Sequence, residues 1–141
     1  MHPTRIRATT PDPTPAATLR RAADYLEAHG WIQGQYYASW NDEQPAACTV
    51  GALAVAAYGY PHPEPFCDDF EAGDDALIDC WSAFVNAEFA LAAYLGLLRV
   101  DERRDPDDME SVHTWNDKPA RTGPEVIAAL RAAADDYEAA S

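Results

Sequence analysis

Lysine is nearly absent from this sequence: Lys118 is the only one, and ten basic residues face 24 acidic ones, for a net charge of −14. A surface of that sign repels phosphates, which excludes direct binding to the backbone of a nucleic acid. The acidity could instead imitate DNA or attract a basic protein. Because the acidic residues are spread over several segments, we interpret them as an ordinary solvated surface.

Long hydrophobic runs and paired cysteines are missing too. No apolar run approaches the roughly 20 residues that a membrane span needs, and the N-terminus lacks the apolar stretch of a secretory signal. We therefore expect no contact with a membrane. The three cysteines, Cys48, Cys67 and Cys80, are an odd number without CxxC spacing. This predicts reduced thiols in a cytoplasmic protein rather than a disulfide framework.

The apolar residues that are present suffice for one core. An apolar fraction of 48% with four tryptophans excludes a disordered chain, and 141 residues fit one domain. The abundance of alanine favours closely packed helices over sheets. Three prolines without any periodic pattern predict a flexible arm over residues 1–13, followed by a single helical domain over residues 14–141.

The predicted fold class is all-α, a bundle of about five helices around a buried central helix. That central helix covers about 48–58, where the sequence is apolar on every side. The first helix begins at Thr14-Pro15 and ends near His29, with an inner stripe of Ala16, Leu19, Ala22, Ala23 and Leu26 and an outward Arg20–Asp24 pair.

Three further helices and one loop complete the predicted bundle. A long helix covers about 74–95, and a short one begins at Asp105-Pro106 and carries Met109 and Val112. The last helix opens with the capping box Thr122-x-x-Glu125. Its buried stripe is Val126, Leu130, Ala133 and Tyr137. Residues 31–47 form an aromatic-rich loop with room for a short strand.

One tripeptide occurs twice, as Trp40-Asn41-Asp42 and as Trp115-Asn116-Asp117, each followed by proline, threonine and a helix. An ancient duplication would make the two segments equivalent, but their alignment needs a gap. A coincidence in an alanine-rich chain is the simpler interpretation.

Three blocks of sequence resemble a family of small actinobacterial and phage proteins of unknown function. They are AADYLEAHGWIQG, ACTVGALAVAA and WNDKPARTGPEVIAALRAAA. The family pattern of G-W, C-x-x-G-A and W-N-D with R-T is matched at Gly30-Trp31, at Cys48 to Ala52, and at 115–117 with 121–122. The resemblance implies a shared fold and no particular activity. A histidine at the position of His113 is not part of that pattern, which argues against a catalytic role for it.

Cys48 precedes the buried helix, where free N–H groups and the helix dipole would stabilise a thiolate. A nucleophilic cysteine also needs a base and an orienting group, and His113 with Asp117 or Asn116 could supply them. The simpler alternative is that Cys48 fills space beside Thr49, the predicted N-cap of this helix.

The proline-rich connection over residues 60–73 contains possible metal ligands. His62, Glu64, Cys67, Asp68 and Asp69 are close in sequence, but neither a zinc-deaminase nor an EF-hand pattern is complete. We therefore expect a solvated loop, and neither a metal nor a cofactor.

Trp115-Asn116-Asp117 most simply anchors the last helix, because Asn and Asp side chains bond nearby backbone N–H groups in turns. Asp117 is also in position to pair with Arg121. The alternative is contact with a ligand by Trp115 and Asn116, in a pocket shared with Trp31 and Trp40.

Glu88 stands out on the long helix. At 3.6 residues per turn it falls in the centre of an apolar face, which predicts a buried carboxylate that is paired, protonated or facing a cavity. The apolar residues of that face are Leu77, Trp81, Phe84, Leu91, Ala92 and Leu95. The role of Glu88 is either structural, bonded to a helix N-terminus or an arginine, or that of an acid, base or ligand anchor.

These residues lead to two functional hypotheses. The first is a binding or accessory protein that engages a small ligand in an aromatic-lined pocket, formed by Glu88, Trp31, Trp40, Trp115 and Asn116, or a protein partner. The second is a cysteine-dependent hydrolase or acyltransferase with Cys48 as nucleophile, His113 as base, and Asp117 or Asn116 orienting it. An enzyme needs Cys48 and His113 within hydrogen-bond reach beside an open cleft.

Overall fold

The computed structural model describes residues 12–62, 75–97 and 111–140, and it confirms the all-α class. The helices are α1 (Pro15–His29), α2 (Thr49–Tyr58), α3 (Asp75–Tyr94), α4 (Val112–Asn116) and α5 (Gly123–Ala140). Within those ranges the loop over residues 31–47 forms isolated bridges, of Ala47 with Trp31 and Tyr37, and no strand. Residues 1–11 of the predicted arm over 1–13, most of the 60–73 connection, and the predicted helix start at Asp105-Pro106 lie outside the described residues.

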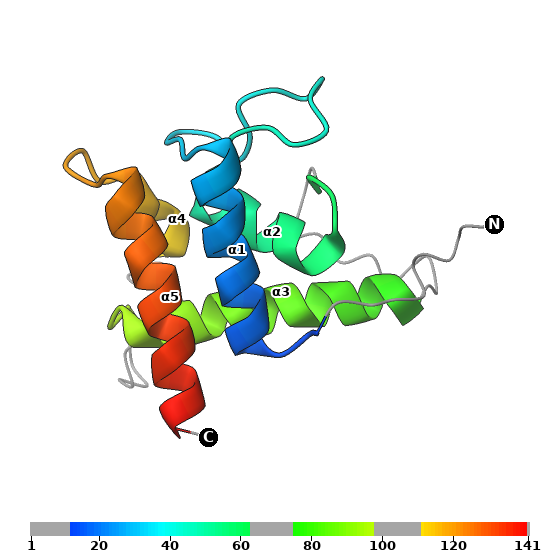
Figure 1. Cartoon of the computed structure of the whole chain (residues 1–141), viewed down its shortest axis with the longest axis vertical. Coiled ribbons are helices and arrows are strands. Elements are labelled where there is room, and N and C mark those ends of the chain that lie inside the picture. The colour runs from blue at the N-terminus through cyan, green and yellow to red at the C-terminus, as the bar shows by residue number, and fades with distance from the viewer. Residues whose placement is uncertain (1–11, 63–74, 98–110, 141) are drawn as a thin grey trace, which may run out of the picture.

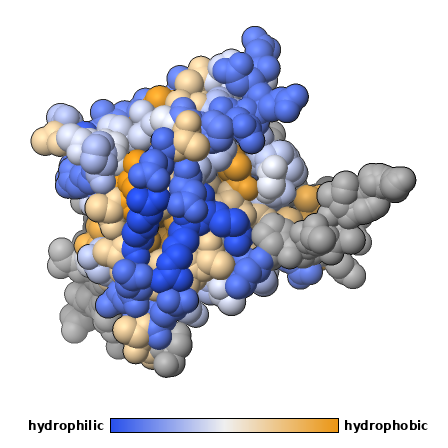
Figure 2. All heavy atoms as spheres, in the orientation of Figure 1, coloured by the Kyte–Doolittle hydropathy of each residue, from blue (hydrophilic) through white to orange (hydrophobic). Residues whose placement is uncertain are grey.

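Helices α1 and α5 run antiparallel, side by side, and α3 crosses behind both (Figure 1). The predicted inner stripe of α1 is buried throughout. On the outer side, Arg20 bonds Asp135 of α5 at 2.7 Å, and Arg131 of α5 bonds Asp24 at 2.9 Å. The expected pair of Arg20 with Asp24 is therefore wrong, because each side chain reaches an opposite charge on the neighbouring helix. Figure 2 shows that hydrophilic side chains gather on this face of the molecule, over α1 and α5.

Helix α2 is the central helix, as predicted. All its residues except Val55 are buried, so it has no polar side to turn outward. Its N-cap is Cys48 and not Thr49: the Cys48 Sγ accepts a hydrogen bond from the Gly51 N–H at 3.3 Å. The helix ends at Gly59, whose φ of 89° is left-handed and suits glycine.

The buried side of α3 is rotated from the predicted one and overlaps it: Phe84, Leu91 and Ala92 are buried as expected. Ala83, Phe84, Ala87 and Leu91 are its most buried residues, while Trp81 and Glu88 are half-buried. Alanine lets the crossing helices approach α3 closely, so the inner face is rotated toward Ala83 and Ala87. Trp81 and Glu88 are consequently left at its edge, while Phe84 and Leu91 stay in the core.

Helix α3 is more apolar over its length than the search of the sequence for long hydrophobic runs indicated. By length and composition alone, residues 76–94 of α3 could cross a membrane, and only 28% of that window is buried within the domain. Core helices of globular proteins meet the same criterion. Helix α3 therefore carries much apolar surface that the described residues do not cover.

The last helix begins as the capping box predicts. The Glu125 N–H donates to Thr122 Oγ1 and the Thr122 N–H to Glu125 Oε1, both at 3.3 Å. Val126, Leu130 and Ala133 are buried as expected. The prediction for Tyr137 is wrong: its side chain is exposed.

Candidate functional site

The fully buried side chain of Asn116 joins three distant segments of the chain. Its Oδ1 accepts hydrogen bonds from Trp31 Nε1 at 2.7 Å, from the Thr49 N–H at 2.9 Å and from Thr49 Oγ1 at 2.6 Å. Its Nδ2 donates to the Ile32 carbonyl at 3.2 Å and to Asp117 Oδ1 at 2.9 Å. Every donor and acceptor of this amide is therefore used inside the fold, which leaves none for a ligand.

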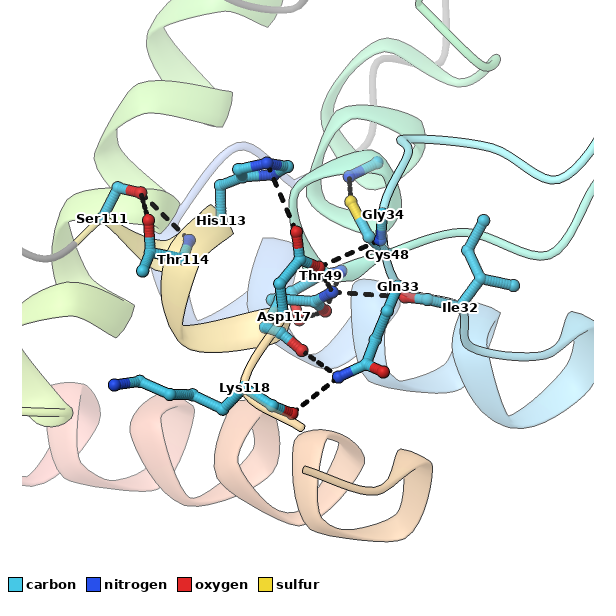
Figure 3. A network of polar contacts seen from close by, with 12 residues as sticks. Ile32, Gln33, Gly34, Cys48, Thr49, Ser111, His113, Thr114, Asp117 and Lys118 are labelled. Atoms are coloured by element: carbon cyan, nitrogen blue, oxygen red, sulfur yellow. Dashed lines mark hydrogen bonds and ion pairs between the residues drawn. The ribbon is translucent and has the colours of Figure 1, made fainter. Parts of the chain in front are cut away.

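Asp117 continues this network toward the surface. Its Oδ1 also accepts from the Gly34 N–H at 3.1 Å, and its Oδ2 lies 3.5 Å from His113 Nε2 (Figure 3). Burial by itself would raise the pKa of Asp117, but the hydrogen bonds from Asn116 and Gly34 hold that pKa below its ordinary value. The Gln33 amide, from the same loop, donates to the carbonyls of Asn116 and Lys118. The loop over residues 31–47 is thus attached to the end of α4.

Trp115 anchors this turn in the core, with 8% of its surface exposed. The guanidinium of Arg121 lies 4.0 Å from the centre of the indole, and its Nε donates to the Trp115 carbonyl at 3.0 Å. Arg121 pairs with Glu125 at 2.7 Å and not with Asp117, whose carboxylate is already held by Gly34 and His113. Both faces of this turn are therefore held by contacts inside the protein.

Cys48 lies beside this network with a fully buried thiol. Burial raises the pKa of Cys48 to about 11, so the group stays protonated at neutral pH, even though N–H groups of α2 point at the sulfur. Among the described residues its sulfur bonds Gly51, and no hydrogen bond links it to His113. In Figure 3 the dashed line from Cys48 likewise leads to a backbone nitrogen. The geometry pairs His113 with Asp117 but gives this pair no thiolate to activate.

The two Trp-Asn-Asp segments have different environments. Asn116 is fully buried in α4, whereas Asn41 lies in the exposed loop and Trp40 is 62% exposed. Trp40 packs its edge against Tyr37 at a ring distance of 5.1 Å. The identical tripeptides thus occupy unlike structures, which supports coincidence over duplication.

Trp31 borders an open surface pocket of about 640 Å³ between α1 and the start of α5. Leu26, Ile127 and Pro124 supply most of its apolar wall. Trp31 therefore has one edge in the Asn116 network and a face on this pocket. Of the five residues predicted to share a ligand pocket, Trp31 is the one that lines this pocket, and a hydrogen bond joins it to Asn116.

Glu88 is half-buried on α3, and no hydrogen bond or ion pair engages it within the described part of the chain. The expected pairing is therefore not found there. Burial raises the pKa of Glu88 to about 7, because taking a carboxylate out of water is costly. Of the three states predicted for it, burial favours the protonated one at pH values below about 7.

A second open groove, of about 510 Å³, runs between α3 and α5. Its wall is mostly apolar and includes two exposed aromatic side chains, Phe89 at 62% and Tyr137 at 41% exposure. Asp136 is the charged residue of its lining. Sequence reasoning missed this surface, although the spacing of Val85, Phe89 and Ala93, four residues apart, marks a second apolar side of the helix.

A comparison with known protein families identifies the family of this chain. A family model matches residues 10–136. The chain belongs to the family of unknown function DUF6197. No curated protein and no solved structure matches it significantly. The predicted resemblance to a family of unknown function is therefore confirmed. In this DUF6197 protein, the segments that contain Gly30-Trp31, Cys48 to Ala52 and Trp115-Asn116-Asp117 meet at Asn116, through Trp31 and Thr49.

Proposed function

We propose that this DUF6197 protein is a non-catalytic binding or accessory protein whose partner is another protein, docked in the groove between α3 and α5. The observation that carries the proposal is the exposure of Phe89 and Tyr137 on either side of an apolar groove of about 510 Å³. Large aromatic side chains are among the groups that contribute most to binding at protein interfaces.

The shape of the groove favours a protein over a small molecule. Sites for small ligands enclose most of the ligand's surface, whereas this groove opens along the outside of two helices. A protein partner covers such a surface from above and removes Phe89 from water. We propose that the residues of the G-W, C-x-x-G-A and W-N-D motifs build the Asn116 network, and that the binding face is separate from them.

Site-specific photo-crosslinking tests the proposal. A photoreactive phenylalanine analogue replaces either Phe89 or Trp40, which are matched because each is 62% exposed. In living cells, position 89 should give one discrete crosslinked species of higher mass, and position 40 should not. Identical patterns from both positions, or a crosslink from position 89 only to its own chain, would refute docking at this groove.

Two alternatives each have one observation in their favour. The pocket beside Trp31 could take a small ligand, and Gly123→Ala would test this, since the added Cβ would lie 3.5 Å from the Trp31 Cβ and narrow the pocket without a clash. The hydrolase alternative has the His113–Asp117 pair, 3.5 Å apart, but requires a reactive Cys48. Its buried, protonated thiol makes this the weaker alternative.

A further inference from the structure

We infer that the groove between α3 and α5 recognises an amphipathic helix of another protein that carries a basic residue beside its apolar anchors. The inference rests on the proposed function and adds the chemistry of the partner. Its basis is the lining of the groove and the charges at its rim.

The apolar part of the recognition comes from two helices. Phe89, Ala90 and Ala93 of α3 face Ala133 and Tyr137 of α5 across the groove. A lining that combines small residues with two exposed aromatic side chains suits a third helix, whose apolar ridge can pack against it. Such a segment would present leucine-like side chains about one turn apart.

The charged part of the recognition comes from the end of α5. Asp136 lines the groove and makes no hydrogen bond or ion pair with the described residues. The neighbouring acids Asp135 and Glu138 share one cation, Arg20, at 2.7 and 2.8 Å. Arg20 is thus engaged by two other carboxylates, and Asp136 remains as the charged residue of the groove, in a chain whose net charge is −14. A lysine or arginine of the partner would therefore complement Asp136 and speed association.

The charge also decides against other occupants of the same groove. A second copy of this chain would bring an equally acidic surface to the rim, and like charges facing each other are destabilising. A membrane with anionic lipids would be repelled for the same reason. A basic amphipathic segment is the occupant for which both the apolar and the charged parts of the groove have a complement.

Two synthetic helical peptides serve as probes. Both carry the same leucine face, and one has lysines beside it where the other has glutamines. At about 0.15 M salt, the full chain should bind the lysine peptide about tenfold more tightly than the glutamine peptide, measured by calorimetry. Asp136→Asn should lower that preference to about threefold. Glu43→Gln, which removes one exposed charge far from the groove, should leave it unchanged.

Phe89→Ser separates this inference from the proposed function. Phe89 is 62% exposed, so the variant should fold normally and lose binding of both peptides. If both peptides bind equally well and Phe89→Ser abolishes their binding, the groove is a docking site but the inference of a basic partner is wrong. A lysine preference that survives Phe89→Ser would overturn both, because charge alone would then explain it. If the chain dimerises and Phe89→Ser abolishes the dimer, the occupant is a second copy of the chain. If it binds phosphatidylcholine vesicles and Phe89→Ser abolishes that binding, the occupant is a lipid surface. Either result would overturn the inferred partner.

Discussion

Replacing Asn116 by alanine should be among the most damaging single substitutions in this protein. The change leaves the Trp31 Nε1–H and the Thr49 N–H without their acceptor and removes the donor of the Ile32 carbonyl. A buried polar group that loses its partner costs about 1–3 kcal/mol. Trp31 is half-buried and can turn partly to water, so we expect a total loss of about 3–5 kcal/mol in the free energy of unfolding.

The assay is chemical and thermal unfolding followed by circular dichroism. A loss of that size corresponds to a fall of about 10–20 °C in Tm for a domain of this length. Asn41→Ala is the matched control, because Asn41 occupies the same position in the other Trp-Asn-Asp segment but lies exposed. It should change stability by less than about 0.5 kcal/mol. A loss below about 1 kcal/mol in Asn116→Ala would refute the central role given to this amide.

Asn116→Asp distinguishes hydrogen bonding from the loss of volume. It keeps the size and the acceptor oxygen but sets a second carboxyl group 2.9 Å from the Asp117 oxygen that now accepts from Nδ2. Burial and the like charge raise the pKa of the introduced group in the folded state above its unfolded value. Its protonated form can still donate, so the variant should be most stable at low pH and lose stability as pH rises. A destabilisation that does not change with pH would contradict this.

Three further predictions concern single residues. Because the pKa of Glu88 is raised from 4.5 to about 7, its contribution to stability is fully present below pH 4.5 and is lost as pH rises through 7, by as much as ~3 kcal/mol. In urea titrations at pH 5 and pH 8, the wild-type protein should lose stability at the higher pH and Glu88→Gln should not. An equal loss in both proteins would contradict this prediction. Cys48→Ser should leave the initial rate of thiol labelling at neutral pH unchanged, since the buried Cys48 does not react; a lost fast phase would favour the hydrolase. Thr122→Ala should lower the free energy of unfolding by about 1 kcal/mol, and an unchanged denaturant midpoint would count against the capping box.

The helices whose ends carry their own signals were predictable from the sequence. Thr14-Pro15 and the Thr122-Glu125 box satisfy the first free N–H groups of α1 and α5 from residues three positions apart. Local hydrogen bonds of this kind need no tertiary partner. The place of α2 was predictable as well, because a helix without a polar side is stable only when surrounded.

The role of the second Trp-Asn-Asp segment was decided by tertiary structure. Both copies of the tripeptide have the same local preferences, yet Asn116 meets Trp31 and Thr49 while Asn41 meets solvent. The partners of Asn116 lie 67 and 85 positions away in the chain. No local pattern encodes contacts over such separations, so the sequence indicates a turn at both places and cannot tell which one is buried.

The orientation of α3 was likewise set by packing. Its sequence is apolar on two sides, so periodicity permits either to face inward, and the larger side chains made the side with Trp81 and Glu88 the more plausible one. The inner side includes Ala83 and Ala87 beside Phe84 and Leu91, because the small alanines let neighbouring helices approach α3 closely. That choice leaves Phe89 on the surface and Glu88 half-buried, and therefore creates the groove on which the proposed function depends.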